Sequence, residues 1–72
     1  MKIEYSKQAD ALYIYLKETY VARSREIENG IIIDLDENGF LIGIEVLGVS
    51  EKLTPSELTN ITIENIPVEV GV

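Results

Sequence analysis

Two Asn-Gly pairs constrain the middle of the chain more strongly than any other feature of the sequence. Each pair follows a glutamate, in the triplets Glu28-Asn29-Gly30 and Glu37-Asn38-Gly39. Both residue types tolerate positive φ, and Asn-Gly is a preferred pair in tight β-hairpin turns. The segment 31–36 between them alternates apolar and other residues, as a strand does. The sequence therefore predicts a three-stranded antiparallel meander centred on residues 31–36.

Further strands are predicted on both sides of this segment. Residues 21–28 carry arginines and glutamates, which indicates a charged edge strand that resists unwanted pairing. Residues 40–47 form the longest predicted strand, and its core face carries Phe40, Ile42, Ile44 and Val46. Residues 2–6 and 11–17 are expected to pair as a first hairpin, in which the second strand turns Leu12, Ile14 and Leu16 to the core.

A helix start is recognisable in the last third of the chain. Thr54 can cap a helix, Pro55 suits its first position, and Glu57 completes a capping box. The pattern predicts one short helix at residues 55–59. Alternation then resumes at 61–64 and continues through 66–70, which indicates one more strand or two at a sheet edge.

The expected fold is therefore mainly β, at the margin of α+β. It is an antiparallel β meander of about five to six strands with one short helix near the C-terminal third. Seventy-two residues make a single small domain, 1–72, whose core is marginal without a disulfide, a metal or a partner chain.

Composition narrows the function classes. There is no Cys, so disulfides and thiolate metal sites are excluded, and no His, which removes the usual zinc ligand and general base. We therefore expect no enzymatic activity, no catalytic residues and no cofactor. Oligomerisation is the remaining way to reinforce the core, and a homodimer is its simplest form.

The charge and the hydropathy pattern bear on partners. The net charge of −7 repels phosphate backbones and anionic lipids, so we expect no nucleic acid and no membrane. The same charge suits a basic protein partner, although it also serves solubility alone. Apolar runs are far shorter than the ~20 residues of a membrane span, and the N-terminus lacks a signal-peptide pattern.

One stretch matches a calcium-binding pattern in full. From Asp34 to Glu45 the residues satisfy D-x-[DN]-x-[DN]-G-x₅-E, the signature of an EF-hand loop. That loop needs flanking helices, whereas the flanks here are strand-like. A hairpin would carry Glu45 roughly 20 Å from the turn, at about 3.4 Å per residue. We expect no metal site of this kind, and the only weak candidates for a divalent cation are Asp34, Asp36 and Glu37.

A second apolar surface is the expected interface. Tyr13 and Tyr15 fall on the strand face opposite the predicted core, and tyrosine is enriched where proteins meet. The alternative is that the short helix and the C-terminal segment cover this surface. The candidate interface residues are Tyr13, Tyr15, Leu41, Leu47, Ile61 and Ile63.

Three segments together resemble a known family. They are Met1-Lys2-Ile3-Glu4-Tyr5, Ala9-Asp10-Ala11-Leu12-Tyr13-Ile14 and Gly43-Ile44-Glu45-Val46-Leu47. They are similar to the YuzE-like small proteins, domain of unknown function 2283, over roughly residues 1–53. The chain departs from that pattern at Gly48-Val49-Ser50-Glu51-Lys52, where members often continue Ala-Ser-Lys. The resemblance implies a prokaryotic, cytoplasmic protein with no assigned activity, and it hints at an antitoxin-like role beside small toxin-like proteins.

The leading functional hypothesis is a non-enzymatic interaction module. It would act as a homo-oligomer, against a basic protein partner, or both. The alternative is a small-ligand or divalent-cation binding protein that uses the acidic hairpin at 34–38.

Overall fold

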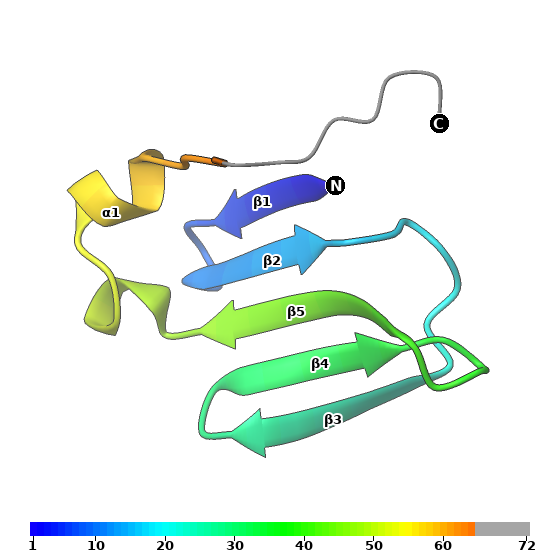
Figure 1. Cartoon of the computed structure of the whole chain (residues 1–72). Coiled ribbons are helices and arrows are strands. Elements are labelled where there is room, and N and C mark those ends of the chain that lie inside the picture. The colour runs from blue at the N-terminus through cyan, green and yellow to red at the C-terminus, as the bar shows by residue number, and fades with distance from the viewer. Residues whose placement is uncertain (65–72) are drawn as a thin grey trace.

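The computed structural model describes residues 1–64, which form one five-stranded antiparallel sheet in the order β1-β2-β5-β4-β3 (Figure 1). The predicted fold class is confirmed, including the single short helix. The elements are β1 (Lys2–Ser6), β2 (Ala11–Tyr15), β3 (Arg23–Glu28), β4 (Ile31–Leu35), β5 (Leu41–Leu47), a 3₁₀ turn (Val49–Glu51) and α1 (Pro55–Thr59).

The sheet joins two locally folded units. One is the hairpin of β1 and β2, and the other is the predicted meander of β3, β4 and β5. They meet where β2 pairs with β5 at the centre of the sheet. The connection between β2 and β3 runs along one end of the sheet and delivers β3 to the far edge (Figure 1). The charged strand is therefore an edge strand, as its composition predicts.

The two Asn-Gly turns are confirmed. Gly30 has a φ of 79° and Gly39 a φ of 84°, a region that glycine enters without steric cost. In the second turn, the Asp36 carboxylate accepts hydrogen bonds from the backbone amides of Asn38 and Phe40, each at 2.9 Å. This capping holds Phe40 in the turn with 66% of its surface exposed. Its predicted place on the core face is wrong, because the strand begins one residue later at Leu41.

Asp10 links the turn between β1 and β2 to the 3₁₀ turn that follows β5. Asp10 ends the turn between β1 and β2 with a φ of 49°. Its carboxylate accepts from the Ser50 hydroxyl at 2.6 Å and the Ser50 amide at 3.0 Å, and its carbonyl accepts from the Val49 amide at 3.0 Å. The bond to the Ser50 hydroxyl is the main cause that lowers the pKa of Asp10. Val49 is fully buried beside this clamp.

The helix forms as its capping box predicts. The Glu57 amide donates to the Thr54 hydroxyl at 3.2 Å, and the Thr54 amide donates to the Glu57 carboxylate at 2.9 Å. The strand predicted at 61–64 is wrong. Its alternation favours extended backbone, but no strand in the described part of the chain pairs with these residues, and Ile61 and Ile63 are more than 60% exposed. The strand predicted at 66–70 lies outside the described residues.

Candidate functional site

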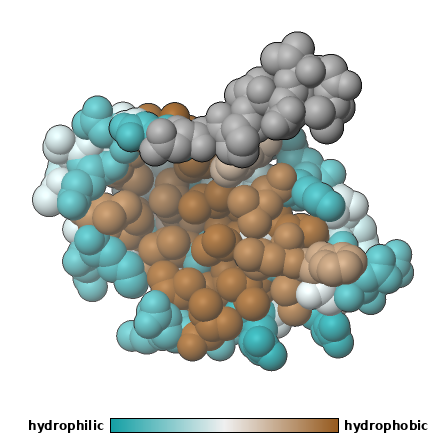
Figure 2. Space-filling view, viewed as in Figure 1, coloured by the Kyte–Doolittle hydropathy of each residue, from teal (hydrophilic) through white to brown (hydrophobic). Residues whose placement is uncertain are grey.

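One face of the sheet carries two rows of cross-strand apolar neighbours. Because directly opposed residues share a face, the register of β1, β2, β5 and β4 defines both rows. The first is Ile3, Ile14, Ile44 and Ile33, and the second is Tyr5, Leu12, Val46 and Ile31. We call these eight residues the apolar face. Figure 2 shows it as a broad hydrophobic area with a hydrophilic rim.

The apolar face is not covered by a second layer of the described chain. Six of its residues keep intermediate exposure, and Ile3 and Tyr5 are 37% and 43% exposed. Among the residues that the structure describes, the buried hydrophobic side chains are Ala11, Ile42 and Val49. Of the strand residues predicted to form the core, Ile42 is buried, whereas Leu12, Ile14, Ile44 and Val46 remain half-exposed. Sequence alternation identified this face correctly but could not reveal that most of it has no covering layer within residues 1–64.

Charge is distributed unequally over the two faces. On the apolar face, β3 adds Arg25 opposite Ile33, and its bulge adds Glu28 opposite Ile31. The other four strand carboxylates, namely Glu4, Glu26, Asp34 and Glu45, pair in register with residues of the opposite face. The interior of the apolar face, from β1 to β4, thus contains no charged side chain.

The opposite face carries the two tyrosines, and we call it the tyrosine face. The rings of Tyr13 and Tyr15 lie with their centroids 4.3 Å apart. Of the predicted interface residues, Leu47 joins them there, since it pairs with Ala11. Leu41 lies apart, opposite Leu35 beyond a bulge, and Ile61 and Ile63 lie outside the sheet.

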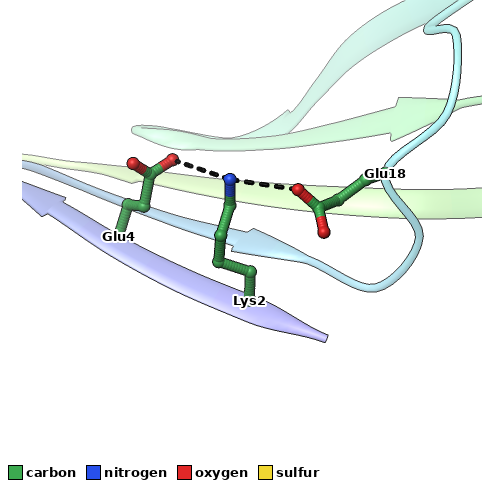
Figure 3. A network of polar contacts seen from close by, with 3 residues as sticks. All are labelled: Lys2, Glu4 and Glu18. Carbon is green, nitrogen blue, oxygen red and sulfur yellow. Dashed lines mark ion pairs between the residues drawn. The ribbon is translucent and has the colours of Figure 1, made fainter.

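A lysine is held over one of these rings. Lys2 Nζ lies 3.0 Å from Glu18 Oε1 and 3.8 Å from Glu4 Oε1 (Figure 3). The same atom lies 4.6 Å from the centroid of the Tyr15 ring. The hydrogen bond with Glu18 is the main cause that raises the pKa of Lys2, and bonding with Glu4 is the main cause that raises the pKa of Tyr15. The ring and the carboxylates together favour a cation at this position.

Beside the tyrosines lies an open groove of about 240 Å³. Its floor and walls combine aromatic, acidic and small side chains: Glu4, Tyr5, Ser6, Ala9, Ala11, Tyr13, Tyr15 and Glu45. The sequence indicated no role for Lys2, Glu4 or Glu18, because their proximity to the tyrosines depends on strand register, which no local sequence signal specifies.

The acidic hairpin spreads its carboxylates instead of converging them. Asp34 is 6% exposed and accepts a hydrogen bond from the Ser24 hydroxyl, while Asp36 caps the turn. Glu37 is exposed in the turn, and Glu45 lies on β5 opposite Ile32 and Tyr13. Burial raises the pKa of Asp34. Within residues 1–64, no three acidic side chains come close enough together to hold a metal ion.

Three residues from the segments that carry the family resemblance, Asp10, Tyr13 and Glu45, have structural roles in the sheet. Asp10 clamps the hairpin turn to Ser50, and Tyr13 and Glu45 are directly paired neighbours on β2 and β5. None of the helices in the described part of the chain has the length and apolar character needed to cross a membrane.

Comparison with known proteins identifies the family of the chain. Residues 2–50 match the family model described as protein of unknown function, DUF2283. An uncharacterized protein of Methanocaldococcus jannaschii, MJ0789, is 35% identical over 51 residues, which are 71% of this chain and 43% of that protein. The chain thus spans less than half the length of this curated relative. No solved structure matches significantly. Because the family model covers most of the chain, the protein belongs to the DUF2283 family.

Proposed function

We propose that this chain is a non-enzymatic interaction module that forms a homodimer through its apolar face. The observation that carries the proposal is the pair of apolar rows that the described chain leaves without a covering layer. Sheets with one apolar face are stable when a second layer packs on that face, and two such sheets pack about 10 Å apart in a sandwich. A second copy supplies an identical layer.

The size of the apolar face supports a modest interface. Four strands about 4.8 Å apart, with five residues of about 3.3 Å each, give an apolar face of about 320 Å². Two copies would therefore bury about 640 Å² before their rims are counted, which is below the roughly 1,200 Å² of standard specific interfaces and corresponds to a weak, transient dimer. We expect a dissociation constant in the micromolar range.

Electrostatics agrees with this choice of face. Each chain carries a net charge of −7, so two copies repel each other at long range. Pairing through the apolar face turns Glu4, Glu26, Asp34 and Glu45 outward and apart. Since salt screens the remaining repulsion, dimerisation should tighten as ionic strength rises. The tyrosine face is less suited to self-association, because pairing through it would bring those carboxylates together.

The outward tyrosine face would remain available to a basic protein partner. An acidic surface does not suit nucleic acid or an anionic membrane. On the family resemblance and the archaeal relative, we further propose a prokaryotic, cytoplasmic protein. An antitoxin-like role would fit a partner that is basic.

Two neighbouring isoleucines give a matched test. Ile33 and Ile32 are adjacent on β4, both half-buried, but Ile33 lies on the apolar face and Ile32 on the opposite face. Threonine preserves the strand preference of each position. Burying an isoleucine contributes about 1.5–3 kcal/mol, and the interface contains two copies. Ile33→Thr should therefore weaken the dimer at least tenfold, whereas Ile32→Thr should leave it nearly unchanged, as measured by light scattering after size exclusion.

Two other results would place the dimer interface on a different surface of the chain. Dissociation by Ile32→Thr or Tyr15→Lys, with Ile33→Thr still dimeric, would contradict the proposal in favour of the tyrosine face. Dissociation by truncation after Asn60, with Ile33→Thr dimeric, would contradict it in favour of the C-terminal segment. Circular dichroism of each variant checks that the sheet is retained.

A further inference from the structure

We propose that the groove on the tyrosine face binds an arginine side chain of a basic protein partner. The proposal rests on the proposed function in one respect: a dimer formed through the apolar face leaves this groove exposed on both copies. The groove has three elements that recognise a guanidinium group, namely an aromatic platform, flanking carboxylates and a hollow beside them.

The carboxylates flank the platform on both sides. Tyr13 on β2 is directly opposite Glu4 on β1 and directly opposite Glu45 on β5. Cβ atoms of directly opposed residues are about 5 Å apart, which places both carboxylates beside the Tyr13 ring. Glu4 also bonds with Tyr15 and pairs with Lys2 at 3.8 Å, so Glu45 is the main acceptor for a bound guanidinium. Tyr13, Glu4 and Glu45 all line the groove.

A glycine allows the tyrosine ring to lie across the sheet. Gly43 is the neighbour of Tyr15 on β5, and a Cβ atom there would lie 2.8 Å from Tyr13 Oη and 3.2 Å from Tyr13 Cε1. The absence of a side chain therefore makes room for the Tyr13 ring. The centroid of the Tyr15 ring is 4.3 Å from that of Tyr13, so the two rings form one aromatic surface.

The chain already binds a cation of its own on half of this surface. Lys2 Nζ lies 4.6 Å from the Tyr15 centroid and pairs with Glu18 and, at longer range, with Glu4. This arrangement demonstrates the chemistry that the Tyr13 half would repeat. Within residues 1–64, Glu45 forms no ion pair, so its carboxylate can accept hydrogen bonds from a partner.

Arginine fits the groove better than lysine. Its planar guanidinium can stack on a tyrosine ring while it donates in the ring plane to carboxylates on either side. The ammonium of lysine is a more strongly hydrated point charge that cannot do both. The net charge of −7 would also speed the approach of a basic protein.

The test uses blocked tripeptides and the full-length protein. Acetyl-Gly-Arg-Gly-amide is titrated into ¹⁵N-labelled protein, with the lysine peptide and the uncharged citrulline peptide as comparisons. We expect chemical-shift changes centred on Tyr13 and Glu45, with affinity in the order arginine, lysine, citrulline. Glu45→Gln should weaken arginine binding about fivefold, as the loss of one solvent-exposed ion pair would. Glu37→Gln is the matched control, since it removes the same charge from the exposed turn and should change affinity less than twofold.

The aromatic requirement is tested separately. Tyr13→Phe keeps a ring and should retain binding, whereas Tyr13→Leu should lose most of it. Equal weakening by Glu45→Gln and Glu37→Gln, or equal affinity for the arginine and citrulline peptides, would overturn the proposal. Repeating the titration on Ile33→Thr separates the two proposals. If the monomeric variant still binds the arginine peptide, the groove binds arginine independently of the dimer. If the parent protein dimerises but does not bind the peptide, the proposal for the groove is refuted and the proposed dimer is not.

Discussion

Replacing Gly43 with alanine tests how the tyrosine face is packed. Gly43 has a φ outside the left-handed region, so alanine adds no backbone strain there. Its new Cβ would instead meet Tyr13, with Oη at 2.8 Å, Cε1 at 3.2 Å and Cζ at 3.3 Å. The first distance is shorter than real contacts allow, and the ring must therefore move.

The expected cost can be estimated from two opposing effects. Overpacking typically costs about 1–3 kcal/mol, and the ring can relieve part of it by moving outward. Alanine also lowers the conformational entropy of the unfolded chain, which stabilises the folded state by about 0.4–1 kcal/mol. We expect Gly43→Ala to lower the free energy of unfolding by about 1 kcal/mol. That corresponds to a loss of about 4–8 °C in Tm for a domain of this size.

A double-mutant cycle isolates the contact. Tyr13→Phe removes the oxygen that makes the shortest contact, so Gly43→Ala should cost less in that background. The expected coupling is about 0.5–1 kcal/mol, measured by urea unfolding at one fixed protein concentration because dimerisation affects stability. Additivity within about 0.3 kcal/mol would refute the reasoning that the Tyr13 ring lies across Gly43.

Three further predictions concern the hairpins. Gly39→Val places a β-branched residue at a φ of 84° and should cost about 1–3 kcal/mol, and a Tm equal to that of the parent would contradict this. Burial raises the pKa of Asp34, so the folded chain holds that proton more tightly and stability falls as pH rises through this range. Asp34→Asn should therefore gain stability relative to the parent as pH rises from acid to neutral, and chemical denaturation at several pH values checks it. Low-millimolar calcium should leave Tm unchanged, because no three acidic side chains converge within residues 1–64 and the turn amides already bind Asp36 Oδ1; a rise abolished by Asp36→Asn would count against this.

Local signals in the sequence predicted most of the backbone. The Asn-Gly turns, the capping box and the alternation of apolar residues each act over a few residues, and the corresponding hairpins and helix are present. The strand predicted at 61–64 is absent because strand formation also depends on non-local pairing. Alternation indicates extended backbone, but a strand also needs a hydrogen-bonded neighbour, which is decided by distant parts of the chain.

The candidate sites depend on long-range register, which the sequence did not specify. Pairing of β2 with β5 places Glu45 beside Tyr13 and Gly43 beside Tyr15. The paired residues are at least 28 positions apart in the sequence. The Asp10 clamp to Ser50 spans 40 residues in the same way. The alternation of Leu12 and Ile14 indicated an apolar face, and only the completed sheet showed that residues 1–64 leave most of this face without a covering layer.

The proposed association of two copies of the chain is tested by sedimentation equilibrium at micromolar concentration, in low and in moderate salt. We expect a reversible equilibrium between an 8.1 kDa monomer and a species of twice that mass, shifted toward the larger species by salt. A single species of 8.1 kDa in both buffers, at every concentration up to the high micromolar range, would contradict it.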